Sequence, residues 1–388
     1  MSAPTRSQSL ADSAANSAVQ SLIERQVAEG RQVGVQVCVY EDGVPVVDAW
    51  AGTMGPDDPR PIQPDSLILS FSVTKGVTGL AVHILAERGL IDYDAPVSKY
   101  WPGFTGYGKE KLTVAQALTH QGGLHAMPSG QFQKEWITDW DAAVKRLEEQ
   151  IPAYEPGTAT GYHAVTHGWI AGQIVQGAAG RHIKDIIREE IAEPLGMADS
   201  MFVGIPDGLD NRLTTLALAV LGEGAPLPED ADMFKAMPKD QWQYFNDLDI
   251  RKACLPSGNG HFTARALAKM YSALAGDGSV DGVRLVQPDR IQHMNRLVTN
   301  DIDRVLLSPI RKGIGFFLGG ETNGVVGAMG RRVTAFGHPG AGGSTALCDP
   351  EVGLSVAILM NKMAFGAPGT VGVGEEIANL IRAELGLE

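Results

Sequence analysis

Cysteine is scarce in this chain of 388 residues, and its three cysteines do not suggest a disulfide framework. Cys38, Cys254 and Cys348 are odd in number and far apart, and none belongs to a Cys-x-x-Cys pair. Disulfide scaffolds and structural zinc sites need paired, closely spaced cysteines, so neither is expected. Because Cys38 and Cys348 lie in apolar stretches typical of strands, we expect them to be small buried hydrophobic side chains.

Long hydrophobic runs and basic charge are also lacking. No window approaches eighteen consecutive apolar residues, and residues 1–20 are polar without the apolar core of a signal peptide. We therefore expect a cytoplasmic protein that does not act at a membrane. The net charge of −13 argues against nucleic acid or an anionic lipid surface as partner, because both attract basic proteins.

Several catalytic signatures are missing as well. There is no Gly-x-Ser-x-Gly elbow and no glycine-rich phosphate loop of the Walker or dinucleotide type, which argues against an α/β-hydrolase triad and a nucleotide site. His163 and His167 have the spacing of a zinc-binding helix, but Ala164 stands where that motif has its glutamate. We expect no metal and no cofactor.

Hydrophobic periodicity predicts strands near both ends of the chain and helices in the middle. The first part reads as a helix, a hairpin and a loop, at residues 9–29, 33–40 with 44–50, and 52–65. Predicted helices follow at 73–88, 114–118, 140–150, 164–179, 183–191 and 264–275. Predicted strands return at 313–319, 333–338, 344–349 and 354–361, before a closing helix at 374–385.

This order predicts an α/β (α+β) fold, with one antiparallel sheet built from both termini and flanked by helices. We expect a single domain over residues 1–388. Its sheet part is residues 1–65 with 281–388, and residues 66–280 form an inserted, mainly helical subdomain. A cleft between the two parts is the natural site. Within the insertion, residues 204–252 show little periodicity and carry Trp242; they are either a cleft wall or a surface loop.

The candidate for a catalytic motif is the stretch Phe71-Ser72-Val73-Thr74-Lys75 at the start of a helical run. Ser72 and Lys75 are three residues apart, so they share a helix face. A hydroxyl beside an amine at the positive end of a helix favours a nucleophilic serine. Taken alone, the spacing fits an ordinary helix start with Ser72 as its cap equally well.

Three further stretches can be compared with it. Tyr162 ends a turn-rich run that leads into a helix, where a phenol can face a cleft. The glycine-dense run 336–344 would let backbone N–H groups approach a ligand oxygen closely. The run 118–124 ends in paired glycines. Each stretch also has an ordinary structural explanation. Tyr162 could be a packed tyrosine, the run 336–344 a tight turn, and the run 118–124 a helix C-cap.

Taken in order, these stretches resemble the motifs of the serine β-lactamase-like superfamily, and most closely the class C β-lactamase-related (family VIII) carboxylesterases. The resemblance spans about residues 20–385. It rests on five motifs in the expected order, namely Ser72-Val73-Thr74-Lys75, Leu118-Thr119-His120-Gln121-Gly122-Gly123-Leu124, Pro156-Gly157 with Tyr162, Pro194-Leu195-Gly196-Met197, and His338-Pro339-Gly340. It implies the β-lactamase/transpeptidase-like fold.

The resemblance also implies roles for individual residues. Ser72 would be the acylated nucleophile, Lys75 its hydrogen-bonded partner, and Tyr162 the general base or proton relay. Lys75 and Tyr162 titrate together, so which of them takes the serine proton is left open. The backbone N–H groups of Ser72 and Ala341 would form the oxyanion hole. The residues expected to bind substrate are His338, Gly340, Gln121 and Trp242.

Two departures from the lactamase pattern favour esters over β-lactams. Ala164 stands where the pattern has an asparagine that holds the lactam amide, and His338 replaces a lysine that binds the lactam carboxylate. We expect a serine carboxylesterase for short to medium acyl chains, acting on a small-molecule ester. The alternatives are an acyltransferase, a D-amino-acid amidase or peptidase, a weak β-lactamase, and a non-catalytic penicillin-binding-like scaffold.

Overall fold

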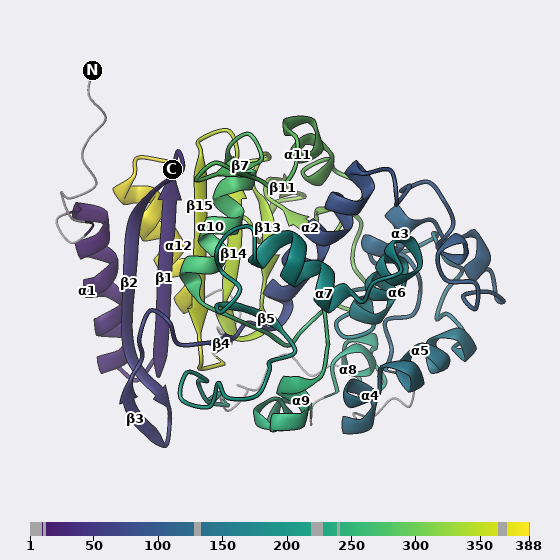
Figure 1. Cartoon of the computed structure of the whole chain (residues 1–388), viewed down its shortest axis with the longest axis horizontal. Coiled ribbons are helices and arrows are strands. Elements are labelled where there is room, and N and C mark those ends of the chain that lie inside the picture. The colour runs from purple at the N-terminus through teal and green to yellow at the C-terminus, as the bar shows by residue number, and fades with distance from the viewer. Residues whose placement is uncertain are drawn as a thin grey trace.

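An eight-stranded sheet, with strands from both ends of the chain, organises the computed structural model (Figure 1). The model describes Leu10 and residues 13–127, 133–218, 228–238, 241–363 and 371–387. The strand order is β3-β2-β1-β15-β14-β13-β10-β9, and neighbouring strands are antiparallel. Their bounds are β1 Gly34–Glu41, β2 Val44–Gly55, β3 Asp58–Pro61, β9 Lys312–Gly313, β10 Phe316–Leu318, β13 Phe336–Pro339, β14 Thr345–Asp349 and β15 Leu354–Met360.

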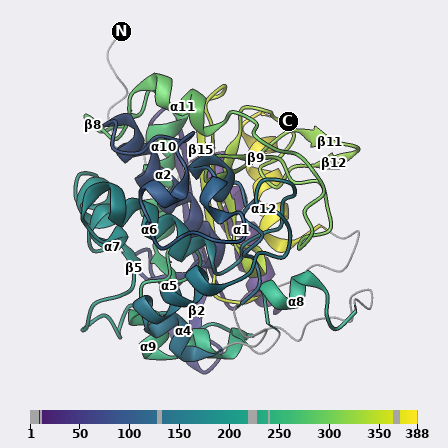
Figure 2. The same ribbon diagram turned by 90° about the vertical axis from the view of Figure 1, so that its right-hand side faces the viewer.

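Helices cover both faces of this sheet. The terminal helices α1 (Ala14–Ala28) and α12 (Val373–Glu384) lie side by side on one face (Figures 1 and 2). On the other face, α10 (Ala264–Ala275) packs against β1, β14 and β15. Helix α2 (Thr74–Glu87) is buried over nearly its whole length, as expected for a helix that is apolar on all sides.

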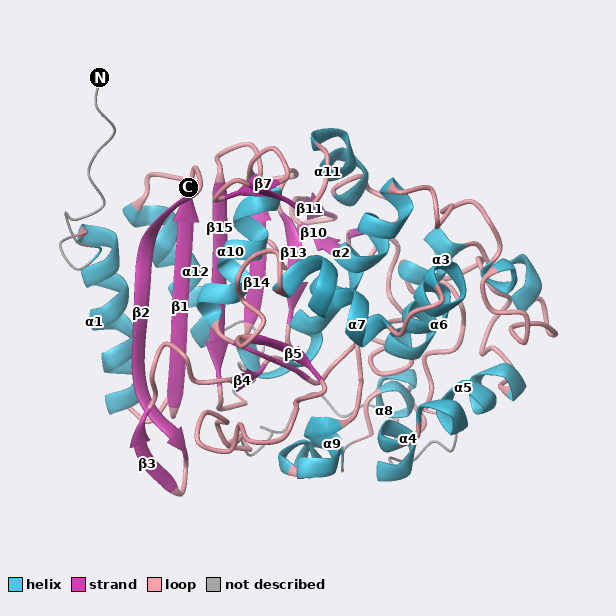
Figure 3. Cartoon of the chain, in the orientation of Figure 1, coloured by secondary structure: helices cyan, strands magenta, loops and turns pink. Residues whose placement is uncertain are grey.

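The remaining helices gather beside the sheet, as Figure 3 shows. They are α3 Val114–Leu118, α4 Lys134–Thr138, α5 Trp140–Glu149, α6 His167–Ala179, α7 Ile183–Ile187, α8 Asp232–Ala236, α9 Leu248–Lys252 and α11 Pro288–Met294. Short strands complete the structure. One small sheet contains β4 Ile68–Leu69, β5 Met201–Val203 and β6 Gly260–Phe262. Two separate pairs are formed by β7 Ser279–Val280 and β8 Val283–Arg284, and by β11 Glu321–Thr322 and β12 Val325–Val326.

The predicted fold class is confirmed, since one antiparallel sheet joins the two termini and helices lie between them in sequence. The division into parts at residues 65 and 280 stays a prediction. One expectation was wrong, because residues 52–65 are not all loop: β2 continues to Gly55 and β3 pairs with it. Prolines suggested a loop there, but an edge strand tolerates them because its outer N–H groups need no partner.

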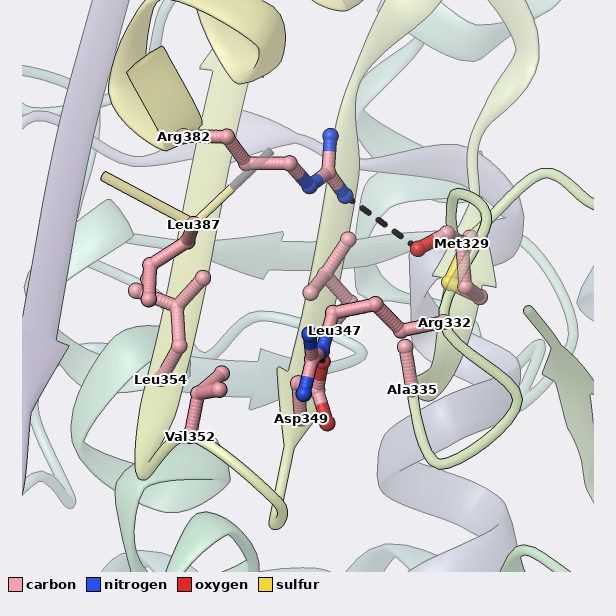
Figure 4. Close-up of a pocket in the computed structure, with 9 residues that line it drawn as sticks. All are labelled: Met329, Arg332, Ala335, Leu347, Asp349, Val352, Leu354, Arg382 and Leu387. Atoms are coloured by element: carbon pink, nitrogen blue, oxygen red, sulfur yellow. Dashed lines mark hydrogen bonds and ion pairs between the residues drawn. The ribbon is translucent and has the colours of Figure 1, made fainter. Parts of the chain in front are cut away.

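A small cavity lies away from the expected site. This cavity, between α12, β14 and β15, is lined by Arg332, Asp349, Arg382 and apolar side chains (Figure 4), and none of the predicted site residues line it.

Among the described residues, no helix has both the length and the apolar character to cross a membrane. Cys38 and Cys348 are buried thiols, as expected.

Candidate active site

Ser72 lies at a tight entrance to helix α2. It occupies a 3₁₀ turn, Phe71–Val73, and not the first α-helical turn that the sequence suggested. The 3₁₀ turn leads directly into α2, whose first turn carries Lys75, so the two side chains lie on one face and come close together. Ser72 is half-buried, whereas Lys75 and Tyr162 are buried. The hydroxyl is therefore the accessible member of the predicted trio.

Lys75 is surrounded by acceptors. Its Nζ lies 2.7 Å from the carbonyl oxygen of Ala164, 2.8 Å from that of Ser257 and 3.2 Å from Ser72 Oγ. Burial lowers the pKa of this amine well below its usual value, because the charged form is poorly solvated there. A neutral amine has two N–H groups, which the two carbonyls occupy. Its lone pair is then left for the Ser72 hydroxyl.

Tyr162 lies against the same amine. Lys75 Nζ is 4.8 Å from the centre of the Tyr162 ring. Burial raises the pKa of the Tyr162 phenol above its usual value, and the charge of Asp303 adds to this, while a hydrogen bond with Ser72 opposes it. The phenol is thus protonated at neutral pH. A protonated phenol bonded to Ser72 can donate or relay a proton, whereas the lowered pKa of Lys75 favours its neutral form, which can accept one. Which of the two takes the serine proton stays a prediction.

The end of β13 runs beside Ser72. A Cβ atom on Gly340 would come within 2.6 Å of the Ser70 carbonyl oxygen, so only glycine permits this approach. The contact places Gly340 and Ala341 next to the turn that carries Ser72. Such a placement suits the predicted use of the Ala341 N–H as an oxyanion donor, and that role stays a prediction.

His338 is buried at the same strand end. Burial, followed by the nearby Lys75, lowers its pKa to about 3, despite a hydrogen bond to the Pro339 carbonyl that favours the charged form. That bond uses Nδ1, at 2.7 Å, which makes Nδ1 the protonated nitrogen. Nε2 is then an acceptor, and it is buried without a partner among the described residues. A neutral imidazole in this state offers an anion no charge.

The other two predicted substrate-binding residues differ in their surroundings. The Trp242 ring packs edge-on against the Phe71 ring at 5.5 Å, and Phe245 does the same at 5.2 Å. Residues 241–246 of the irregular segment therefore pack against the residue that precedes Ser72, and the substrate-binding role of Trp242 stays a prediction. Residues 219–227 and 239–240 lie outside the described residues. The Gln121 side-chain amide donates a hydrogen bond to Thr119 Oγ1. Its role in substrate binding stays a prediction.

Phe71 itself has an unusual backbone conformation. Its φ is +44°, in the left-handed region that non-glycine residues rarely adopt. Backbone strain of this kind is held by surrounding contacts and is concentrated at functional sites. The edge-on contacts of the two aromatic rings hold Phe71 in place directly before Ser72.

Sequence reasoning missed much of the site's surroundings. His120, from the motif at residues 118–124, is buried, with its ring 4.8 Å from Tyr162 and 4.9 Å from His167. Burial lowers the pKa of both imidazoles. A buried ion pair, Asp303 with Lys312, also borders the tyrosine. No spacing signals these contacts, because the residues are far apart in sequence.

The fold and this Ser-Lys-Tyr arrangement together define the serine β-lactamase-like class of proteins. Within that class, residues 19–372 match the model of the family described as Beta-lactamase. The chain therefore belongs to the β-lactamase family.

Three relatives illustrate the range of this family. The chain is 34% identical over 351 residues to the esterase/beta-lactamase LipL of Mycobacterium tuberculosis, covering 85% of this chain and 77% of LipL. A crystal structure of a family VIII carboxylesterase superposes with a TM-score of 0.84 at 32% identity, covering 95% of this chain and 98% of that one. A penicillin-binding protein homologue from Caulobacter crescentus gives 0.85 at 33% identity, covering 96% and 98%.

Proposed function

We propose that this chain is a serine carboxylesterase that cleaves small esters through an acyl-Ser72 intermediate. The observation that carries the proposal is the half-buried Ser72 hydroxyl, 3.2 Å from a buried Lys75 amine whose pKa is lowered by burial. An amine that is neutral near physiological pH can accept the serine proton. The similarity to LipL and to a family VIII carboxylesterase supports the choice of ester.

In the proposed reaction, Ser72 Oγ attacks the ester carbonyl carbon while Lys75 Nζ takes its proton. The Ser72 and Ala341 N–H groups stabilise the resulting oxyanion. As the C–O bond breaks, the Tyr162 phenol protonates the leaving alcohol, and the Lys75 ammonium returns a proton to Tyr162. Water then attacks the acyl-enzyme by the same steps and releases the acid and free Ser72.

The surroundings of Ser72 favour uncharged esters over β-lactams. His338 is neutral, and its free Nε2 is an acceptor, so it cannot pair with a lactam carboxylate as a lysine would. Ala164 offers its carbonyl to Lys75 and has no side-chain amide with which to hold a lactam side chain. Weak β-lactamase activity is a second candidate, which the name of LipL supports. Hydrolysis of nitrocefin measured beside p-nitrophenyl acetate would compare the two.

The test is a Ser72→Ala variant assayed with p-nitrophenyl acetate and butyrate. We expect loss of nearly all activity, and a mass increase of one acyl group on the wild-type chain that is absent from the variant. Ser21→Ala, at an exposed position on α1, is the control. Wild-type turnover by Ser72→Ala would refute the proposal. Failure of a fluorophosphonate to label the folded protein would favour the non-catalytic scaffold.

A panel of esters and D-amino-acid amides, with and without an alcohol acceptor, would distinguish the esterase from the amidase and acyltransferase alternatives. Acyl transfer would yield a new ester when alcohol is added, and an amidase would release ammonia from the amides. The cytoplasmic location also stays a prediction, which fractionation of the native host would check.

A further inference from the structure

Asp303 and Lys312 form an ion pair that is removed from solvent. Asp303 Oδ2 and Lys312 Nζ are 2.7 Å apart, and their side chains are 0% and 1% exposed. Burial alone would raise the pKa of Asp303, but the charge and hydrogen bond of Lys312, together with hydrogen bonds from the Leu306 and Tyr162 N–H groups, lower it, which favours the ionised carboxylate. Buried ion pairs are often no more stabilising than apolar side chains of the same volume, so this pair is weak evidence for a purely stabilising role.

The carboxylate holds the backbone of the candidate proton relay. Asp303 Oδ1 accepts a hydrogen bond from the Tyr162 N–H at 2.9 Å. The same oxygen accepts from the Val305 and Leu306 N–H groups, each at 2.9 Å. These two bonds form a side-chain turn that fixes the Asp303 carboxylate relative to its own loop. The position of Tyr162 is thereby tied to that loop.

The lysine connects the same segment to the large sheet. Lys312 lies on β9, at the edge of that sheet, and its Nζ donates to Thr160 Oγ1 at 2.6 Å. The Arg304 N–H donates to the Thr160 carbonyl at 3.0 Å. On its other side, the segment is held by the Gly161 N–H, which donates to the His120 carbonyl. Residues 160–162 are therefore held from two sides.

We propose that Asp303 and Lys312 are positioning residues that hold the Tyr162 segment in register with Ser72 and Lys75. The inference rests on the proposed function, because it assigns them to the acylation that Tyr162 assists. Neither residue touches the reacting atoms; they act through the Tyr162 N–H and the Thr160 hydroxyl. Misplacing a catalytic group by about 1 Å can lower the rate about 100-fold.

Two double variants that differ only in the acceptor test this directly. Asp303→Ala/Lys312→Met removes both the ion pair and the acceptor for the Tyr162 N–H. Asp303→Asn/Lys312→Met removes the charges but keeps an oxygen at that position. The control is Asp349→Asn, which alters a buried carboxylate paired with Arg332 beside the cavity of Figure 4. Hydrolysis of a small alkyl ester, whose alkoxide needs a proton to leave, gives kcat and KM for each protein. Fluorophosphonate labelling reports whether Ser72 reacts, and thermal unfolding reports the stability of each variant.

We expect kcat of the alanine double variant to fall about 10- to 100-fold with KM within about twofold, because only the chemical step needs Tyr162 in place. The asparagine double variant keeps the acceptor but loses the Lys312 bond to Thr160, so its kcat should fall only about three- to tenfold. Asp349→Asn should leave kcat unchanged, whatever its effect on stability. Equal kcat for the two double variants, high or low, would overturn the proposal. A wild-type protein that is not labelled would instead refute the proposed function.

A single variant keeps the inference testable if the alanine double variant does not fold. Thr160→Val removes only the hydroxyl that Lys312 binds and leaves the ion pair intact. Because one hydrogen bond to a charged group is lost, we expect kcat for the alkyl ester to fall about three- to tenfold with KM unchanged. An unchanged kcat in folded Thr160→Val would overturn the proposed positioning by Lys312.

Discussion

Whether Lys75 or Tyr162 takes the serine proton can be decided by two variants. Lys75→Met removes the amine but keeps a side chain of similar length, and Tyr162→Phe removes only the phenol. Because the carbonyls of Ala164 and Ser257 occupy two N–H groups of a neutral Lys75, its lone pair points to Ser72. We therefore expect Lys75→Met to slow acylation far more than Tyr162→Phe does.

The expected magnitude follows from the role of each group. A positioned general base contributes about 10²- to 10⁴-fold, so Lys75→Met should lose a factor in this range. In Tyr162→Phe the base is retained and only assistance to the leaving group is lost. With p-nitrophenolate, which leaves without a proton, that loss should be about tenfold or less. With an alkyl ester, whose alkoxide needs a proton, it should be larger.

The pH dependence separates the two groups further. Acylation needs neutral Lys75, so its rate should rise with pH through the lowered pKa of this amine and level off well below the usual lysine value. The Tyr162 phenol has a raised pKa and should stay protonated across that plateau. The acidic limb should persist in Tyr162→Phe and vanish in Lys75→Met. The burst of p-nitrophenol from p-nitrophenyl acetate, measured by stopped flow from about pH 5 to 10, reports this acylation step.

The opposite pattern would refute the reasoning. If Tyr162→Phe lost the acidic limb and Lys75→Met kept it, the phenolate would be the base and the lone-pair argument would be wrong. Folding must be checked in parallel, because Lys75→Met leaves two buried carbonyls without their donor. Each unsatisfied carbonyl costs about 1–3 kcal/mol, and the total is partly offset by removal of a buried amine. A thermal melt of each variant distinguishes lost chemistry from lost structure.

Two further predictions concern the backbone and the buried imidazoles. Phe71→Gly relieves left-handed strain of about 1–3 kcal/mol but loses the ring contacts that hold the turn, so fluorophosphonate labelling should slow. The control is Tyr107→Gly, because Tyr107 also has a positive φ but is exposed, and its labelling rate should not change. Equal labelling rates for the two variants would contradict a role for the rings. Burial lowers the pKa of four histidines to about 3. Between about pH 6.5 and 3 the unfolded chain therefore binds more protons than the folded one, and the free energy of unfolding should fall as the pH falls. The loss is about 1.4 kcal/mol per histidine per pH unit, measured by urea unfolding, and a flat profile would contradict the burial of His83, His163, His261 and His338 in neutral form.

The sequence predicted those features that depend on local pattern. Helix α3 (Val114–Leu118) and helix α10 (Ala264–Ala275) have the predicted bounds, because each combines apolar periodicity with a threonine cap. The hairpin of β1 and β2 was likewise visible from its alternation and its turn. Ser72, Lys75 and Tyr162 could be selected because the order of motifs along the chain carries information that a single motif lacks.

Contacts between distant residues could not be predicted in the same way. The partners of Lys75 are the backbone carbonyls of Ala164 and Ser257, and a carbonyl has no residue-type signature. Asp303 and Lys312 come from an irregular stretch and a two-residue strand, where periodicity gives no signal. A positive φ at a phenylalanine is also invisible in sequence, because aromatic residues rarely adopt it.

The described surroundings of Ser72 contain little net charge before reaction, and this links the fold to the choice of substrate. Burial keeps Lys75, His120, His167 and His338 toward their neutral forms, while Asp303 and Lys312 neutralise each other. A neutral ester loses little solvation on entering such a site, whereas a carboxylate-bearing lactam would enter without a counterion. Charge first develops on the ester oxygen in the transition state, where fixed N–H groups act most strongly in a site of low polarity. In the proposed mechanism, the burial that lowers the pKa of Lys75 and lets it act as a base therefore also disfavours anionic substrates.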